Sequence, residues 1–308
     1  LSVSAFSCDI TLPAFWSMRD DLGAPIEWVQ AIVPVFLIFQ AFGQLLFGPV
    51  SDRYGRRPVV LAGLAIYIGG AMIAILANSI GVVHLGRAAQ GFGSACGIVV
   101  GRAILRDVSH GTALAQAMAF AMAIFALGPI SAPLVGYGLV AIGSWRGIFF
   151  GMALFATALV GLALLFKETH RNPDPAALKR ENLTGALSRI VRHPQSRYFL
   201  LLAALAQYSI VSFVASAPRF FQSQFGVEGL PFALLFAATG LGIIVGQIAN
   251  QRLIGRLGVL TATRVAAGVL LGVSAAMTLL SFADLLGLAT FVLLIFTFNT
   301  SFLVVMAN

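Results

Sequence analysis

The sequence predicts an all-α membrane protein composed of two pseudo-symmetric bundles of helices. Hydrophobic residues make up 59% of the chain and charged residues only 10%, and the mean hydropathy of +0.95 lies well above the range of soluble proteins. Its apolar runs are about 20 residues long, which is the length that spans a bilayer as a helix. A motif of the first half also recurs in the second half. These observations favour an internally duplicated helical membrane protein.

Ten membrane-spanning helices are predicted from the apolar runs and from the turn signals between them. The predicted spans are 1–18, 28–50, 58–77, 80–104, 113–141, 145–167, 197–220, 230–253, 259–282 and 285–308. Because each span crosses the bilayer once, alternate connections lie on the same side of the membrane.

The connections alternate between basic and nearly uncharged segments, and basic connections favour the cytoplasmic side. The three tryptophans, Trp16, Trp28 and Trp145, fall at the opposite ends of the spans, where an indole ring suits the outer membrane interface. The N-terminus is therefore predicted to be cytoplasmic. The basic residues that support this orientation are Arg53, Arg56, Arg57, Arg102, Arg106, Arg252, Arg256, Arg264 and those of the linker at 168–196.

Composition also argues against several functions. The net charge of +8 resides in short connections between apolar spans, which indicates a topology signal and no nucleic-acid partner. Cys8 and Cys96 both lie in apolar runs, and the four histidines have no partner at metal-ligand spacing, so neither disulfides nor a metal site is predicted. No nucleophile with a base, carboxylate pair or metal cluster is recognisable. We therefore predict neither an enzyme nor an organic cofactor.

An internal repeat relates the two halves. An offset of 203 residues superposes Gly43 on Gly246, and the same offset superposes Gly55 on Gly258. Gly255 stands where the first copy has Asp52, so the second copy keeps the turn and loses the acid. Two six-helix lobes are implied.

The repeat divides the chain into an N-terminal lobe at 1–167, a basic cytoplasmic linker at 168–196 and a C-terminal lobe at 197–308. The linker is expected to contain a short surface helix. The first helix is expected to be slightly truncated, and the second lobe to comprise four of six helices, with two more following Asn308.

The first copy of the repeated motif is the densest cluster of charge in the first hundred residues. Asp52 lies among arginines and can bridge helix ends by charge-assisted hydrogen bonds, and Gly55 permits a positive φ. A loop that only sets topology is the alternative. The predicted gating loop comprises Gly48, Asp52, Arg53, Gly55, Arg56 and Arg57.

Two charged residues are embedded in predicted spans. Asp9 is the only carboxylate inside a span, and Arg87 lies at a similar predicted depth. Ionisable groups inside a membrane are costly and usually mark ion or proton pathways, so both are candidates for proton coupling and could pair with each other. The alternatives are a structural acid at Asp9 and an Arg87 that bonds backbone carbonyls and holds the bundle together.

Other residues within spans are candidates for the lobe interface or for a substrate cavity. Glycines and prolines in one span invite a kink or a close helix crossing, although packing alone also explains them. Polar residues in spans either line a cavity or form structural hydrogen bonds between helices. The interface candidates are Gly128, Pro129, Pro133 and Gly136, and the cavity candidates are Gln40, Gln207, Tyr208 and Asn299.

These residues together resemble the major facilitator superfamily, and more narrowly its drug:proton antiporters of the bicyclomycin-resistance (Bcr/CflA) type. The segment from Gly48 to Arg57 matches the loop signature of the superfamily, and Arg87 with Gln90 and Gly91 matches a motif of its fourth helix. Gly128-Pro129 with Gly136 matches the fifth-helix antiporter motif in part. Asp9 followed by Leu12-Pro13-Ala14 resembles the first-helix motif of the bicyclomycin type.

The resemblance implies a monomeric inner-membrane exporter of small organic compounds or drugs that works by alternating access, with protons as the coupling ion. It implies a latch role for Asp52 and its arginines, a proton-coupling role for Arg87 and a lobe-interface role for Gly128, Pro129 and Gly136. Two alternatives stay open. One is a transporter of the same fold for a metabolite such as a sugar or an amino acid, and the other is a membrane sensor or scaffold that transports nothing.

Overall fold

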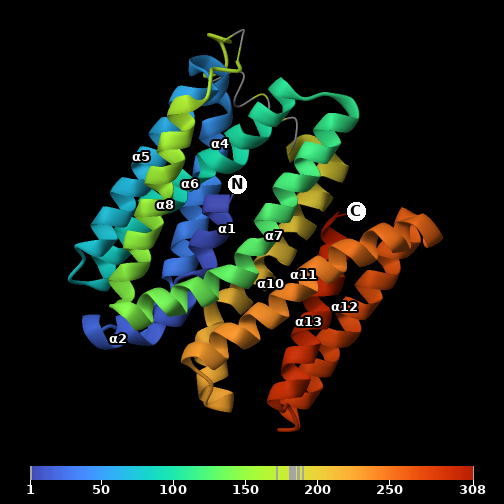
Figure 1. Ribbon diagram of the computed structural model, residues 1–308. Coiled ribbons are helices and arrows are strands. Elements are labelled where there is room, and N and C mark those ends of the chain that lie inside the picture. The colour runs from blue at the N-terminus through green and yellow to red at the C-terminus, as the bar shows by residue number, and fades with distance from the viewer. Residues whose placement is uncertain (1, 171–172, 180–184, 186–187, 189–190, 308) are drawn as a thin grey trace.

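The computed structural model describes residues 2–170, 173–179, 185, 188 and 191–307, and it is helical, with no strand among these residues. Figure 1 shows the helices running between two ends of the molecule. One end carries the turn at Gly55 and the start of the linker, and we call it the linker end. The other end carries Trp16, Trp28 and Trp145, and we call it the tryptophan end.

Helices lie at all ten predicted spans, but the first span is not a single helix. The first half of the chain contains α1 (Ser2–Asp9), the 3-10 helix η1 (Leu12–Ala14), α2 (Phe15–Leu22), α3 (Ile26–Gln30), α4 (Ile32–Tyr54), α5 (Arg56–Ile75), α6 (Ile80–Val108), α7 (Gly111–Ile142) and α8 (Trp145–Leu165). The second half contains α10 (Pro194–Phe225), α11 (Gly229–Leu257), α12 (Val259–Phe282) and α13 (Leu288–Ala307).

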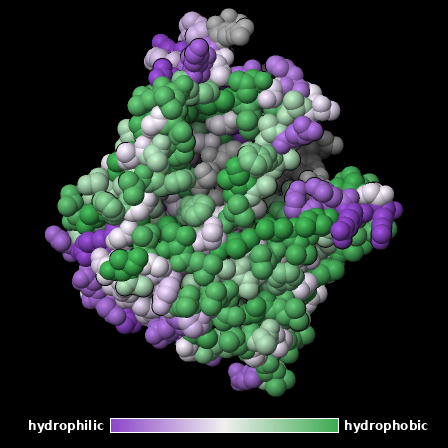
Figure 2. All heavy atoms as spheres, viewed as in Figure 1, coloured by the Kyte–Doolittle hydropathy of each residue, from purple (hydrophilic) through white to green (hydrophobic). Residues whose placement is uncertain are grey.

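The described helices have the length and composition of a multi-pass membrane protein. Among the described residues, 7 helices are long and apolar enough to cross a bilayer, and α7 contributes a shorter apolar segment, Leu127–Ile142. Figure 2 shows hydrophobic residues over the flanks, whereas hydrophilic residues gather at the top, the lower left and the right edge. This distribution fits a chain whose flanks face lipid.

Pro13 explains why the first span is broken. A proline has no N–H to donate to the carbonyl four residues earlier, and its ring clashes with that carbonyl, which here belongs to Asp9. The α-helix accordingly ends at Asp9, and the chain resumes as η1 with Pro13 in its first turn. The prediction of one continuous helix over 1–18 was therefore wrong.

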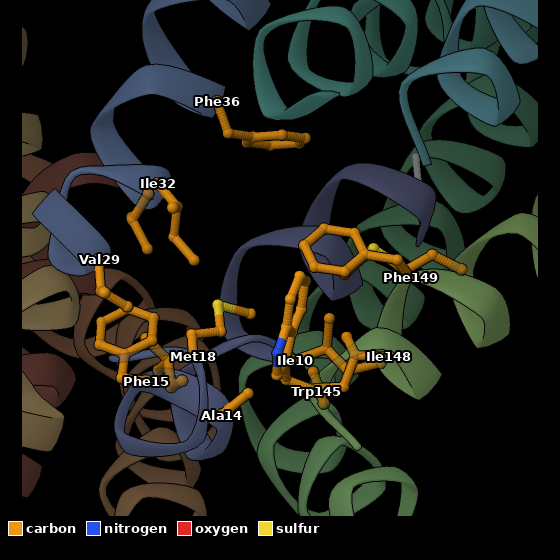
Figure 3. Close-up of a cluster of buried hydrophobic side chains, with 14 of the residues drawn as sticks. Ile10, Ala14, Phe15, Met18, Val29, Ile32, Phe36, Trp145, Ile148 and Phe149 are labelled. Atoms are coloured by element: carbon orange, nitrogen blue, oxygen red, sulfur yellow. The ribbon is translucent and has the colours of Figure 1, made fainter. Parts of the chain in front are cut away.

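The core of the first lobe lies toward the tryptophan end, where α2, α3, α4 and α8 converge (Figure 3). Phe15, Phe36, Ile148 and Phe149 are completely buried there. Trp145 is also buried, and its indole N–H donates to Asp21 at 2.9 Å. Trp145 thus sits at the predicted end of the molecule but packs in the core, whereas Trp28 is 56% exposed.

The internal repeat predicted from the sequence is present in the backbone. Gly55 has φ 97° and ψ 162°, and its counterpart Gly258 has φ 75° and ψ 163°, so both turns use a conformation that favours glycine. A Cβ atom on Gly43 would lie 2.7 Å from a backbone oxygen of α6, and one on Gly246 would lie 2.6 Å from a backbone oxygen of α13. The pairs α4–α6 and α11–α13 are therefore equivalent close contacts.

The two lobes differ in how far their helices are covered. In the first lobe α5 packs against both α6 and α8, whereas α12, its counterpart, packs mainly against α13 and has no neighbour equivalent to α8 among the described residues. A cavity of about 390 Å³ opens between α10, α12 and α13. Its lining is mostly apolar and includes Phe213, Phe220, Met277 and Phe291.

The lobes contact each other through α7 and α11 and through the start of α4 and α10. Gly240 of α11 lies against Pro129 and Ile130, and Gly229 lies 3.5 Å from the Tyr137 ring as measured from an added Cβ atom. These contacts lie in the middle and toward the tryptophan end, since α7 runs toward that end and α11 starts there.

The linker enters the second lobe earlier than predicted, because α10 begins at Pro194 and not near 197. Proline suits this position, where no N–H is required. The surface helix predicted within 168–196 falls largely on residues outside the described ranges.

The close contact at Gly91 yields a test of the fold. In Gly91→Ala the new Cβ would lie 2.1 Å from the backbone oxygen of Phe36, so α4 and α6 would have to separate. We expect the variant to lose about 1–3 kcal/mol of stability, the usual cost of overpacking. Thermal unfolding of the purified protein measures the loss. Gly81→Ala, in the same helix with no atom within 4 Å, is the control and should unfold like the wild type.

Candidate functional site

Asp9 lies at the break in the first span and is buried, with only 5% of its surface exposed. The interruption frees the last carbonyls of α1, which a regular helix would bond internally. The Phe6 carbonyl keeps a helical bond from the Ile10 N–H at 3.1 Å, whereas the Cys8 carbonyl accepts from the Thr11 hydroxyl at 3.1 Å. The Asp9 carboxyl is thus held where the backbone is no longer a regular helix, inside the lobe.

Arg87 is completely buried and donates to another carbonyl of α1, that of Ser7. Its Nη2 donates to the Ser7 carbonyl at 2.9 Å, its Nε to the Ile32 carbonyl at 3.4 Å and its Nη1 to Gln90 Oε1 at 3.2 Å. The guanidinium also lies over the Phe36 ring, 4.3 Å from its centre. Arg87 therefore ties α6 to α1 and α4.

The structure does not contain the hypothesised ion pair between the two embedded charges. Both residues are described, and no salt bridge joins them. Arg87 instead makes the carbonyl bonds that were the alternative interpretation. It remains coupled to Asp9 through the backbone, because Ser7 precedes Asp9 by two residues in α1.

Two of the predicted cavity residues form hydrogen bonds between helices. Gln40 donates from α4 to Ser4 of α1 and, at 3.0 Å, to Ser94 of α6. Asn299 donates from α13 to the Thr239 carbonyl of α11 at 3.0 Å. Each is only 6% exposed, so in this structure both residues make the interhelical bonds of the structural alternative.

The other two cavity candidates are not among the residues that line the described cavities. Tyr208 is 72% exposed and Gln207 is exposed. Neither lines the cavity between α10, α12 and α13. The described residues contain no group of three or more His, Cys, Asp or Glu side chains able to hold a metal ion.

The basic turn is organised around Arg56, which is only 7% exposed. Its guanidinium bonds Asp52 Oδ1 at 2.5 Å, Asp107 Oδ2 at 3.0 Å and the Ser51 hydroxyl at 2.7 Å. Arg56 thus joins the end of α4 to the end of α6. Charge-assisted bonds of this kind, with one partner buried, fix geometry more firmly than exposed ion pairs do.

The remaining residues of the predicted gating loop have different contacts. Arg57 donates to the Leu164 carbonyl at 2.7 Å and so satisfies the end of α8. Arg53 is exposed and lies over the Tyr54 ring, 5.3 Å from its centre. Gly48 has ordinary space around it, because an added Cβ would lie 3.6 Å from the Val99 side chain, so no close backbone contact requires glycine there.

Glu168, the first acid after α8, caps α5 across this turn. Its two carboxylate oxygens accept from the backbone N–H groups of Arg56 and Arg57, each at 3.0 Å. The positive φ of Gly55 favours glycine at this turn, and a Cβ there would lie 2.6 Å from this carboxylate, so a larger residue would also displace the Glu168 side chain. The start of the linker is thereby fastened to the turn, and the His170 ring nitrogen contacts the Asp52 carbonyl at 3.0 Å.

The environment of Glu168 keeps it ionised. Partial burial alone would raise its pKa, but the N–H groups of His170, Arg56, Arg57 and Thr169 bond its carboxylate and hold the pKa below the usual value. A carboxyl whose pKa is lowered by folding stabilises the fold above its unfolded pKa, and the contribution is lost as the pH falls through the folded value.

The glycines and prolines predicted for the lobe interface lie on both sides of α7. Pro129 lies against Gly240 of α11, in the other lobe, whereas Gly136 lies against α1. A Cβ on Gly136 would be 2.1 Å from the Ile10 carbonyl oxygen, directly after the break at Asp9. Gly128 and Pro133 are buried in the same stretch. This part of α7 therefore contacts both the broken helix and the second lobe.

Glu168 is a residue that sequence reasoning assigned only to the linker. Its signal was an acid placed directly after a span, on the same side as a turn with three arginines. No role was predicted for Asp107 from the sequence, and in the structure it is the second carboxylate partner of Arg56.

The cap by Glu168 yields a pH-dependent prediction. Glu168→Gln should lower stability at pH 7 by about 1 kcal/mol, a typical value for a lost cap and modest because the group is exposed. The difference should shrink as the pH falls below about 4.3, the unperturbed value at which the wild-type carboxyl protonates in the unfolded chain.

Thermal unfolding at several pH values measures this difference. Glu228→Gln is the matched control, because Glu228 precedes α11 but its side chain makes no cap bond. A Glu168→Gln protein as stable as the wild type at pH 7 would show that the cap does not stabilise the fold.

Comparisons with known proteins place the chain in a family. The model of the Major Facilitator Superfamily matches residues 1–308. A bicyclomycin resistance protein homolog of Haemophilus influenzae is 27% identical over 267 residues, which are 86% of this chain and 67% of the relative. Multidrug resistance protein D of Escherichia coli is 27% identical over 237 residues, or 77% and 59%. The chain thus spans about two thirds or less of these relatives.

Solved transporters share the fold. The xylose transporter XylE from E. coli, in a partially occluded inward open conformation, has a TM-score of 0.71 at 14% identity, over 99% of this chain and 80% of the transporter. The human organic anion transporter MFSD10 has a TM-score of 0.61 at 20% identity, over 98% and 82%.

The resemblance predicted from the sequence is therefore confirmed. Its loop signature, its two-lobed repeat and the match over the whole chain agree. The chain belongs to the major facilitator superfamily.

Proposed function

We propose that the protein exports small organic compounds by proton antiport and alternating access. The observation that carries this proposal is the position of Asp9, a buried carboxyl at a break in a membrane helix. Such groups are costly inside a bilayer and are kept where they take part in ion or proton movement. Bicyclomycin and multidrug resistance proteins among the relatives support organic compounds or drugs as the substrates.

The break also connects Asp9 to the interface between the lobes. Leu12 and Pro13, three and four residues after Asp9, face Pro218 and Phe232 of the second lobe across a gap of only about 10 Å³. A rocking motion of the lobes would change this contact and hence the surroundings of Asp9. Protonation on one side of the membrane and release on the other is the coupling we propose, with Arg87 fixing the broken helix.

The proposed orientation puts the linker end in the cytoplasm and the tryptophan end outside. The arginines at the linker end support it through the positive-inside rule. We propose the inner membrane as the location, a monomer as the working unit and two lobes joined by the linker at 168–196. The Asp52–Arg56–Asp107 network is the proposed latch at the cytoplasmic side.

The first test changes Asp9 to Asn in the full-length protein. Proton-driven efflux should fall by on the order of 10-fold or more, which corresponds to slowing one step by about 1.4 kcal/mol. Efflux of a panel of organic compounds from proteoliposomes, with and without an imposed pH gradient, measures it. Asp284→Asn, which changes an exposed acid in the turn after α12, should leave efflux unchanged. Undiminished efflux that still follows the pH gradient in Asp9→Asn would exclude Asp9 as the coupling group.

The second test addresses the latch. Asp52→Asn removes one of the two carboxylates bonded to Arg56 and leaves Asp107 in place. We expect efflux to fall by on the order of 5-fold, the factor equivalent to about 1 kcal/mol, with normal insertion and expression. Wild-type efflux rates in this variant would contradict the latch and favour the alternative that the loop only sets topology.

A further inference from the structure

The short helix α3 (Ile26–Gln30) lies at the tryptophan end and contacts both lobes. It precedes α4 in the chain and packs against α2 and α4 of the first lobe. It also contacts α10 of the second lobe. A five-residue helix has little core of its own, so its side-chain contacts decide what holds it.

Two polar contacts connect α3 to the second lobe. Glu27 Oε1 accepts from Arg219 Nη1 of α10 at 2.7 Å. One turn along α3, Gln30 Nε2 donates to the Ala215 carbonyl at 3.2 Å. The two acceptor and donor positions on α10 are four residues apart, so they lie on one face of that helix, opposite α3.

A separate contact fastens α3 to the first lobe. The Trp28 carbonyl contacts Nε2 of His84, a residue of α6, at 2.8 Å. The Trp28 indole stacks on the same imidazole, with ring centres 6.0 Å apart and planes 13° from parallel. The α3 helix therefore has one anchor on α6 and two on α10.

Below these contacts the lobes are sealed by apolar side chains. Leu12, Trp16 and Phe232 enclose the narrow gap between η1 and the second lobe, and Leu12 is completely buried. At the linker end, in contrast, the bonds of the Asp52–Arg56–Asp107 network join helices of the first lobe to one another and to the linker. The two polar bonds between α3 and α10 lie at the tryptophan end.

We propose that α3 is the gate of the tryptophan end. Its clasp consists of two bonds, one from Arg219 to Glu27 and one from Gln30 to the Ala215 carbonyl, and these bonds hold the two lobes together at this end. The proposal rests on the alternating access proposed above. In the closed form described here the clasp is engaged, and the opposite form, open at the tryptophan end, requires both contacts to break.

The ion pair of the clasp suits a gate because it is exposed and weak, and the part-buried Gln30–Ala215 bond is a single neutral hydrogen bond. Glu27 and Arg219 have 59% and 48% of their side chains exposed, so water can replace each partner when the lobes separate. A buried pair would leave unpaired charges on opening and would lock the protein in one state. An exposed clasp shifts the two-state equilibrium modestly, which allows both states to be populated during a transport cycle.

The test measures the opening of the tryptophan end directly. Spin labels are attached to Asp20→Cys in α2 and Ala283→Cys after α12, both exposed, in full-length protein whose Cys8 and Cys96 have been replaced. Double electron–electron resonance then gives the distribution of distances between the two lobes. Glu27→Gln should increase the population at longer distances at least severalfold, and the charge exchange Glu27→Arg with Arg219→Glu should return it toward the wild-type distribution.

The matched control is Asp21→Asn, which removes an ion pair of the same length, 2.7 Å, that joins Asp21 to Arg146 within the first lobe. It should leave the distances unchanged. The clasp is refuted if Glu27→Gln also leaves them unchanged, or if Asp21→Asn lengthens them equally. Because the distances are measured without substrate or a proton gradient, a wrong assignment of the transported compound or coupling ion would leave this result intact.

Discussion

The rest of the structure depends on how the chain satisfies the carbonyls that are left free where α1 ends at Asp9, before Pro13. In a bilayer every backbone polar group needs a partner within the protein, so a proline in a membrane helix demands replacements for the bonds it removes. Thr11 supplies one and Arg87 another, from a helix far away in the sequence. The Arg87 guanidinium replaces a missing helical N–H at the Ser7 carbonyl and also bonds the Ile32 carbonyl. These bonds explain why a permanent charge is tolerated in the core and why α1, α4 and α6 are held together.

The fold could be predicted largely from the sequence because bilayer thickness imposes one length on each span. The repeat was also readable, since Gly55 and Gly258 must be glycine in any copy that makes this turn. The break in the first span and the separate helix α3 were not predicted. Hydropathy reports that a segment lies in the membrane, but it is insensitive to whether successive turns are bonded as one helix.

The site was predictable where a residue type has few uses. A carboxyl in a span and an acid among arginines have few structural explanations, and Asp9 and Asp52 lie at a helix break and in an ion network accordingly. A glutamine or asparagine in a span has two explanations, because its side chain can face water or bond a neighbouring helix. Gln40 and Asn299 bond neighbouring helices in this structure. The sequence does not indicate which neighbour each helix face contacts. The capping role of Glu168 was not predicted for the same reason, since the N–H groups that it caps at the start of α5 are 111 and 112 residues away.

The two copies of the glycine turn show how a duplicated element can diverge. Their backbone angles are nearly the same, but Gly55 is surrounded by the carboxylate of Glu168, whereas an added Cβ on Gly258 would meet nothing within 4 Å. In the first copy, a substitution of the glycine would meet the Glu168 side chain as well as the φ constraint. In the second copy only the local backbone sets a limit. The same turn is therefore built twice under different demands: the first copy combines its glycine with Asp52 and a linker carboxylate, whereas the second has Gly255 at the position of Asp52 and open space around its glycine.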